Sequence, residues 1–110
     1  MRIHLIKEKT IRNFISQHPS GKSSFEDWLA KIKEADWSFP NDIKNTFITA
    51  DLLGKSSFRI VFNIGGNKFR MICKYGFGET EIHLFICWIG THAEYDKICN
   101  DGKQFTINVF

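Results

Sequence analysis

The first half of the chain carries one short strand pattern followed by two helical patterns. Residues 3–6 are mostly apolar and predict a first strand. Apolar side chains then recur at helical spacing over residues 7–17, and again over a stretch that begins at Ser23 or Ser24 and ends near Ala35. Turn residues between these two stretches predict that the helices are separate.

The segment that follows, residues 36–57, has a weaker pattern. It predicts one helical turn after Pro40 within a less regular stretch. Its apolar residues are expected to pack beneath an edge of a sheet, and they are Trp37, Phe39, Ile43, Phe47 and Leu52.

The second half of the chain is rich in strand patterns. Residues 58–64 and 67–75 flank Gly65-Gly66 and predict a β-hairpin. With a two-residue turn, Ile64 would lie opposite Asn67, Phe62 opposite Phe69, Ile60 opposite Met71 and Phe58 opposite Cys73, which makes one face almost entirely apolar. Residues 81–89 are the most apolar stretch and predict a central strand.

The other face of the predicted hairpin carries positive charge. Val61 and Ile72 lie on this face among polar and basic residues, which are Arg59, Asn63, Lys68, Arg70 and Lys74. Slipping the register by one residue would bury these cations without partners, which costs free energy. The pattern therefore predicts a basic sheet face that is open to solvent.

Together these elements predict an α+β fold in which two N-terminal helices pack on an antiparallel β-sheet. The chain has 110 residues, which fits a single domain over residues 1–110. A helical turn over residues 92–97 and a short final strand over residues 106–110 complete the prediction.

Charge and composition narrow the class of protein. The net charge is only +3, but no acidic residue lies between Asp51 and Glu79, where five cations fall. This segregation favours a polyanionic partner, although a solvated face without a partner is the alternative. No apolar run approaches the ~20 residues of a membrane helix, and the charged N-terminus does not resemble a signal peptide. We expect a cytoplasmic protein with no membrane partner.

Candidate chemistry gathers in the stretch G-T-H-A-E-Y-D-K, residues 90–97, after the predicted central strand. On a helical turn His92, Tyr95 and Asp96 share one side. An imidazole can transfer a proton near neutral pH, and an Arg such as Arg70 can hold phosphate oxygens. These groups suit RNA cleavage in which the 2′-hydroxyl attacks the adjacent phosphate. The alternative is that His92 is a helix cap or an ordinary surface residue.

Other side chains give no sign of a second site. The three other histidines are expected to be structural, and the three cysteines to be small buried hydrophobes. No group of residues has the spacing of metal ligands, and Gly65-Gly66 is a hairpin turn rather than a phosphate-binding loop.

Several stretches resemble the HigB family of bacterial toxins, which belongs to the RelE/ParE-like superfamily. The most specific are F-N-I-G-G-N-K-F-R and T-H-A-E-Y-D, and M-R-I-H-L-I, T-I-R-N-F-I-S-Q-H-P and W-S-F-P also fit. The resemblance covers most of residues 1–99. It implies two N-terminal helices on an antiparallel sheet, in agreement with the fold expected from the pattern.

The resemblance also implies an activity and partners. It implies a toxin that acts as an endoribonuclease without a metal or other cofactor and cleaves mRNA on the ribosome. It further implies neutralisation by a helix-turn-helix antitoxin of HigA type, through which alone the toxin would reach operator DNA. The implied catalytic residues are Arg70, His92, Tyr95 and Asp96, and the implied RNA-binding residues are Arg59, Asn67, Lys68 and Lys74.

Two other functions stay open at this point. The basic face could bind RNA or an acidic partner without chemistry, or the protein could inhibit DNA gyrase as ParE-like relatives do. The C-terminal stretch D-G-K-Q-F-T-I-N-V-F adds no clear catalytic residue.

Overall fold

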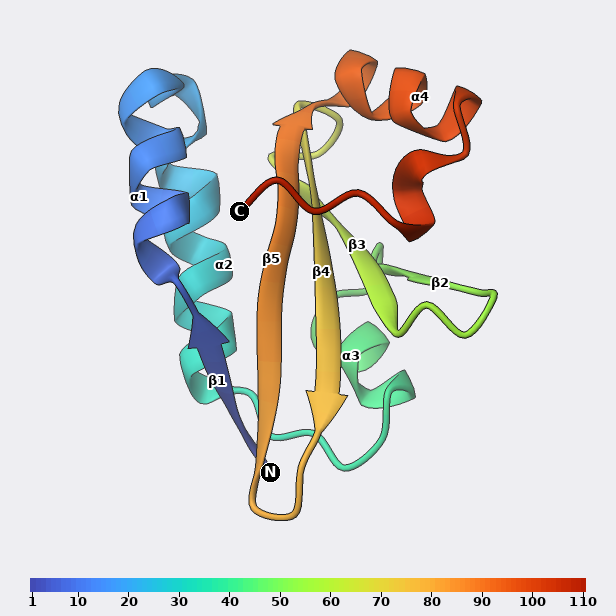
Figure 1. Ribbon diagram of the computed structural model, residues 1–110. Coiled ribbons are helices and arrows are strands. Elements are labelled where there is room, and N and C mark those ends of the chain that lie inside the picture. The colour runs from blue at the N-terminus through green and yellow to red at the C-terminus, as the bar shows by residue number, and fades with distance from the viewer.

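The computed structural model describes all residues 1–110 and contains one five-stranded sheet (Figure 1). The strand order is β1-β5-β4-β3-β2. The strands are β1 (Arg2–Ile6), β2 (Asp51–Leu53), β3 (Arg59–Ile64), β4 (Phe69–Phe77) and β5 (Glu81–Thr91). The α-helices are α1 (Glu8–Gln17), α2 (Lys22–Glu34), α3 (Asn41–Thr46) and α4 (His92–Asn100), and short 3₁₀ turns occupy Pro19–Gly21 and Lys103–Phe105.

The α+β class and the two N-terminal helices are confirmed, with one difference in the sheet. β1 pairs with β5 in parallel, whereas β2, β3, β4 and β5 pair antiparallel. Parallel pairing needs a long connection along the chain. Here that connection contains α1, α2, α3 and the strands β2, β3 and β4. The sheet is therefore mostly, but not entirely, antiparallel.

The main core lies between the helices and one face of the sheet. Side chains at helical spacing on α1 and α2 meet alternate residues of β3, β4 and β5. Fully buried members include Ile11, Phe25, Ile60, Phe62, Met71 and Leu84. The predicted helical turn after Pro40 is confirmed as α3. Trp37 and Ile43 are buried as expected, but Phe39 is 68% exposed, so the prediction that it packs beneath the sheet is wrong.

The predicted hairpin exists, but its register differs by two residues. Ile64 pairs with Phe69 and Phe62 with Met71, so the turn contains four residues rather than two. Gly65 and Gly66 both adopt left-handed backbone angles, with φ of 68° and 67°. A shift of two residues leaves the side chains of β3 and β4 on their expected faces, and the division into an apolar and a basic face therefore survives there. Phe58, expected on the apolar face opposite Cys73, precedes β3 and is 56% exposed, so that part of the prediction is wrong.

The prediction that the basic face is open to solvent is wrong for its two arginines. Arg59 and Arg70 are only 6% and 8% exposed. Apolar side chains share this face and form a second cluster, covered by α4 and the C-terminal tail: Val61, Ile72, Cys87, Trp88 and Ile98. Because these side chains need cover, the face cannot stay fully solvated.

The C-terminal residues provide part of that cover. Residues 106–110 form no strand, so the predicted final strand is wrong. The tail instead crosses β5 and β4 in front of the sheet (Figure 1), and the Val109 amide donates to the Cys87 carbonyl at 2.9 Å. No helix in the structure combines the length and apolar character needed to cross a membrane.

Candidate active site at the start of α4

The stretch G-T-H-A-E-Y-D-K contains the N-terminal cap of α4. The Thr91 hydroxyl accepts a hydrogen bond from the Glu94 amide at 3.2 Å, and the Glu94 carboxylate accepts one from the Thr91 amide at 2.8 Å. This reciprocal pair is a capping box. A Cβ on Gly90 would lie 2.4 Å from the Trp88 ring, so the strand can turn into α4 over Trp88 only with glycine there.

Loss of the cap should destabilise the fold measurably. Thr91→Ala removes the acceptor for the Glu94 amide and should lower the free energy of unfolding by about 1 kcal/mol. Urea denaturation of the variant measures this loss. Thr106→Ala, at an exposed position in the tail, is the matched control and should change the free energy little; equal losses in both variants would contradict the role of the cap.

The same cap should make stability depend on pH. Hydrogen bonds from Thr91 lower the pKa of Glu94 below its usual value. A lowered folded-state pKa contributes stability above the unfolded pKa of about 4.3, and this contribution disappears as pH falls through the folded value. The destabilisation caused by Glu94→Gln in urea should therefore be largest at neutral pH and shrink in acid. A difference that stays constant or grows in acid would contradict the assignment.

His92 is the first residue of α4, directly after the cap. Its backbone amide donates to the Lys68 carbonyl at 3.1 Å, which ties the β3–β4 turn to the start of the helix. Its Nδ1 is sealed from solvent without a hydrogen-bond partner. Nε2 lies 3.6 Å from Asp96 Oδ2, one turn further along α4, and the side chain is 45% exposed. Nε2 is thus the nitrogen that a bound substrate can reach.

Arg70 lies on β4 opposite Gly90, at the same end of the sheet. Its Nη1 donates to the carbonyls of Phe69 at 3.2 Å and Gly66 at 3.4 Å. Nε and Nη2 make no hydrogen bond within the protein, and neither is a sealed polar atom. A guanidinium has five donors, so Arg70 retains donors for a ligand although most of its side chain is covered.

Tyr95 packs in the second cluster, with its ring centroid 6.2 Å from that of Trp88. Burial raises the pKa of Tyr95 most, a hydrogen bond with Cys99 adds to the rise, and the charge of Arg70 opposes it. The phenol therefore stays protonated at neutral pH and can act as a donor, not as a base.

The structure divides the predicted site residues into two groups. One group belongs to the end of the sheet where α4 begins: Arg70 on β4 and His92, Tyr95 and Asp96 on α4, with the exposed Asn67 and Lys68 in the adjoining turn. Arg59 and Lys74 form the second group, paired across β3 and β4 four residues further from the helix.

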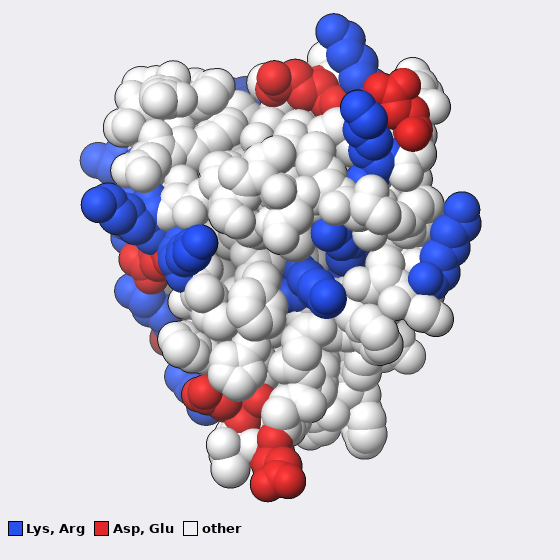
Figure 2. All heavy atoms as spheres, in the orientation of Figure 1, with Lys and Arg blue, Asp and Glu red and all other residues white.

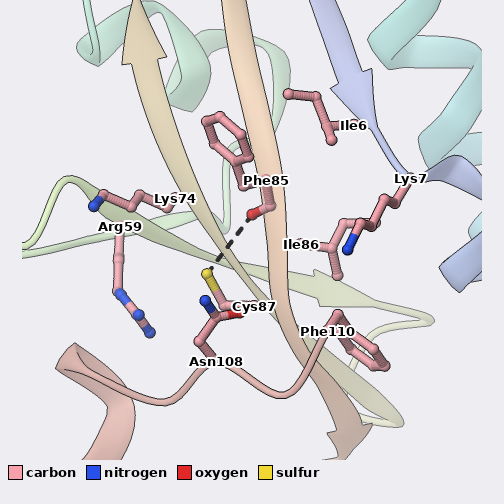
Figure 3. Close-up of a pocket in the computed structure, with 9 residues that line it drawn as sticks. All are labelled: Ile6, Lys7, Arg59, Lys74, Phe85, Ile86, Cys87, Asn108 and Phe110. Atoms are coloured by element: carbon pink, nitrogen blue, oxygen red, sulfur yellow. Dashed lines mark hydrogen bonds between the residues drawn. The ribbon is translucent and has the colours of Figure 1, made fainter.

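This second group lines a pocket that the tail closes on one side (Figure 3). The pocket has a volume of about 310 Å³ and also includes Lys7, Asn108 and Phe110. Arg59 Nη1 donates to the tail carbonyls of Ile107 at 2.6 Å and Gln104 at 3.3 Å. Arg59 thus holds the tail in place, while the exposed Lys74 stays available.

Positive side chains reach the centre of this face of the molecule. Figure 2 shows Lys and Arg without an acidic neighbour at its centre, whereas Lys, Arg, Asp and Glu mix at its upper end and along the α1 side. The centre of the face is therefore the part most suited to a phosphate chain. Burial raises the pKa of Cys73 and Cys87 and keeps both thiols protonated. Cys99 on α4 is only partly buried, so the prediction that all three cysteines are buried is wrong for this one.

Sequence reasoning missed several features of the site. The spacing T-x-x-E at Thr91 and Glu94 is a capping-box signal and could have located the start of α4. The contribution of Lys7 and the tail had no local signal, because it depends on long-range packing. The same holds for a group of possible metal ligands at the other end of β5, formed by His4, Glu81 and His83.

Comparison with known proteins identifies the family. Residues 21–98 match the HigB_toxin family, described as the RelE-like toxic component of a toxin-antitoxin system. The mRNA interferase HigB of Escherichia coli O6:H1 (strain CFT073) is 27% identical over 96 residues, which cover 87% of this chain and 91% of that protein. The mRNA interferase toxin HigB of Escherichia coli K12 is 27% identical over 94 residues, covering 86% and 88%.

The fold is thus that of a RelE-like toxin, with α4 and its site at one end of a mostly antiparallel sheet. The family match spans most of the chain, including β3, β4, β5 and the start of α4. The chain belongs to the HigB toxin family.

Proposed function

We propose that the protein is an endoribonuclease that cleaves mRNA on the translating ribosome by attack of the 2′-hydroxyl on the adjacent phosphate. The relatives named mRNA interferases support the substrate class. One structural observation supports the chemistry most strongly: the reachable Nε2 of His92 and the unused donors of Arg70 belong to the same end of the sheet. The proposed step uses no metal ion.

His92 is the proposed proton donor. Asp96 lies beside Nε2, at 3.6 Å, and can orient the ring. As the 2′-oxygen bonds to phosphorus, the bond to the 5′-oxygen breaks, and Nε2 gives its proton to that leaving oxygen. The proton of the 2′-hydroxyl passes to solvent. The products are a 2′,3′-cyclic phosphate and a 5′-hydroxyl end.

Arg70 is the proposed stabiliser of the transition state. Negative charge builds up on the phosphate oxygens as the 2′-oxygen attacks, and a fixed guanidinium lowers the energy of that state. Its burial favours this role, since charge interactions are stronger away from water. Tyr95 also belongs to the proposed site, and its phenol stays protonated at neutral pH, so any role in the reaction would be as a hydrogen-bond donor.

Three exposed side chains are proposed to hold the RNA chain on either side of the reacting phosphate: Asn67, Lys68 and Lys74. Arg59, also expected to bind RNA, is buried and donates to the tail, so its proposed role is to hold the tail beside this surface. Lys68 and Lys74 are exposed and lie at opposite ends of the same strand pair. Contacts with phosphate groups position the RNA chain and do not distinguish one base from another.

Removal of either lysine should weaken RNA binding in a salt-dependent way. Lys68→Ala and Lys74→Ala should each reduce the slope of log affinity against log salt by about 1, because one phosphate contact is lost. Binding of a short single-stranded RNA to a catalytically inactive His92→Ala background measures the slope. Lys33→Ala, on the exposed side of α2, is the matched control, and an equal change there would rule out a defined RNA path.

A toxin of this family has an antitoxin partner. We propose that this partner is a HigA-type helix-turn-helix protein and that the toxin reaches operator DNA only through it. Copurification from a strain carrying the neighbouring reading frame tests the partner directly. A neighbouring gene without a helix-turn-helix pattern, or no complex with its product, would contradict this proposal.

The ribosome requirement can be tested by supplying one mRNA in two forms. The purified protein should cleave the mRNA in an active translation reaction and leave the same mRNA intact without ribosomes. Equal cleavage of free mRNA would contradict ribosome dependence. Intact mRNA in both reactions, together with inhibition of DNA supercoiling, would favour the gyrase-inhibiting alternative.

A further inference from the structure

Two neighbouring strands bring three metal-binding side chains together at the end of the sheet opposite α4. In the parallel register of β1 and β5, His4 pairs with His83. Glu81 lies two residues before His83 and therefore on the same face of the strand. One ligand atom from each residue can be chosen so that all three atoms lie within 4.8 Å of one another.

The distances within this group are close to those of a zinc site. His83 Nε2 lies 3.0 Å from Glu81 Oε1, and His4 Nδ1 lies 3.7 Å from the same oxygen. Ligands bound at about 2.0–2.1 Å in a tetrahedral zinc site are roughly 3.3 Å apart. Small rotations of the side chains would thus bring all three atoms to bonding distance of one ion.

No other cation neutralises the Glu81 carboxylate. Its ion-pair partners are the two imidazoles. Arg2, the neighbour of Glu81 in the strand register, donates instead to the carbonyls of Lys33 and Glu34 near the end of α2. The carboxylate and both rings are also accessible, with side-chain exposures of 47%, 59% and 38% for Glu81, His4 and His83.

The electrostatic surroundings also favour a cation. Acidic side chains lie at the lower end of the face in Figure 2, near the β4–β5 turn of Figure 1; the central Lys and Arg side chains lie away from it, and basic side chains adjoin it only on the α1 side. Two imidazole nitrogens and one carboxylate oxygen form a ligand set that binds Zn²⁺ and leaves a fourth position for water.

We propose that His4, Glu81 and His83 form a Zn²⁺ site that joins β1 to β5. The ion links an edge strand to an interior strand where no turn connects them. Nine residue steps of extended chain, about 30 Å, lead from His83 along β5 to His92. The site is therefore distinct from the proposed nuclease chemistry, and the two proposals can fail independently.

A titration of the dialysed, reduced full-length chain tests this site. Co²⁺, whose visible absorption reports coordination, should bind at one ion per chain and be displaced by Zn²⁺. His4→Ala, His83→Ala and Glu81→Gln should each weaken binding at least about tenfold. His18→Ala and Cys99→Ser remove other metal-binding groups and should leave the affinity unchanged, since neither residue belongs to the cluster.

A thermal measurement separates metal binding from an effect on folding. Zn²⁺ should raise the unfolding midpoint of the parent protein and leave that of Glu81→Gln, which has nearly the same shape, unchanged. The proposal is overturned by the absence of saturable binding at millimolar metal, by equal affinity in the three ligand variants and the parent, or by an equal thermal shift in Glu81→Gln.

Discussion

Replacement of His92 by alanine is expected to lower the rate of mRNA cleavage by about 10²–10⁴-fold, the usual contribution of a proton-transfer group. The reason is local: Nδ1 is sealed, so Nε2 beside Asp96 is the one nitrogen of this ring that a leaving oxygen can meet. The rate is measured by primer extension on a reporter mRNA in a translation reaction, with parent and variant at equal concentration.

Two further variants distinguish proton transfer from a loss of structure. His92→Gln keeps a polar side chain but cannot act as an acid, so its loss should be similar to that of His92→Ala. His4→Ala removes an exposed histidine at the far end of β5 and should cleave at the parent rate. Full activity of either His92 variant would exclude His92 as the proton donor.

Replacement of Arg70 by alanine is expected to lower cleavage by roughly 10²–10³-fold through the loss of transition-state stabilisation. Arg70 is 8% exposed and its guanidinium keeps donors that no protein group uses. The loss should appear in kcat more than in KM, because the charge that Arg70 stabilises is largest in the transition state. Single-turnover kinetics on programmed ribosomes measures both quantities.

The burial of Arg70 requires its own controls. Arg70→Lys keeps the charge but not the planar pair of donors, and it should recover only part of the lost rate. Arg12→Ala removes an exposed arginine from α1 and should have little effect. If Arg70→Ala has the parent's rate while its circular dichroism and unfolding midpoint are also unchanged, Arg70 has no catalytic role.

Much of the fold could be predicted from the sequence because its local signals agree with one another. The helical spacing on α1 and α2 and the alternation in β3 and β4 each select one buried face. The hairpin register was wrong by two residues, since Gly65-Gly66 does not by itself set the length of the turn. The buried and basic faces were still assigned correctly within the strands, because side chains two residues apart in a strand point to the same face.

The sequence was a poor guide to what covers the second face of the sheet. Val61 and Ile72 lie among cations, and their apolar character signalled that this face is also buried. Which segment would cover it depended on the path of the tail, and residues 106–110 look like a strand although they form none. Arg59 and Arg70 are therefore buried by packing that no local pattern encodes.

The site could be predicted only in part, because some of its residues are close in sequence and others are brought near by strand pairing. His92 and Asp96 are one helical turn apart, so their proximity follows from the sequence once α4 is assumed. Arg70 and Tyr95 come together only through the pairing of β4 with β5. The group of His4, Glu81 and His83 depends on the parallel pairing of β1, a strand whose partner cannot be inferred from spacing.

The central claim is that His92 and Arg70 act together on one phosphodiester. Mapping the ends of cellular transcripts after brief induction tests it most directly. The account predicts new 5′-hydroxyl ends, with matching 2′,3′-cyclic phosphates, that appear with the parent protein and disappear with His92→Ala and Arg70→Ala at equal protein levels. Growth arrest with intact transcripts, or the same cleavage sites and end groups in both variants, would contradict it.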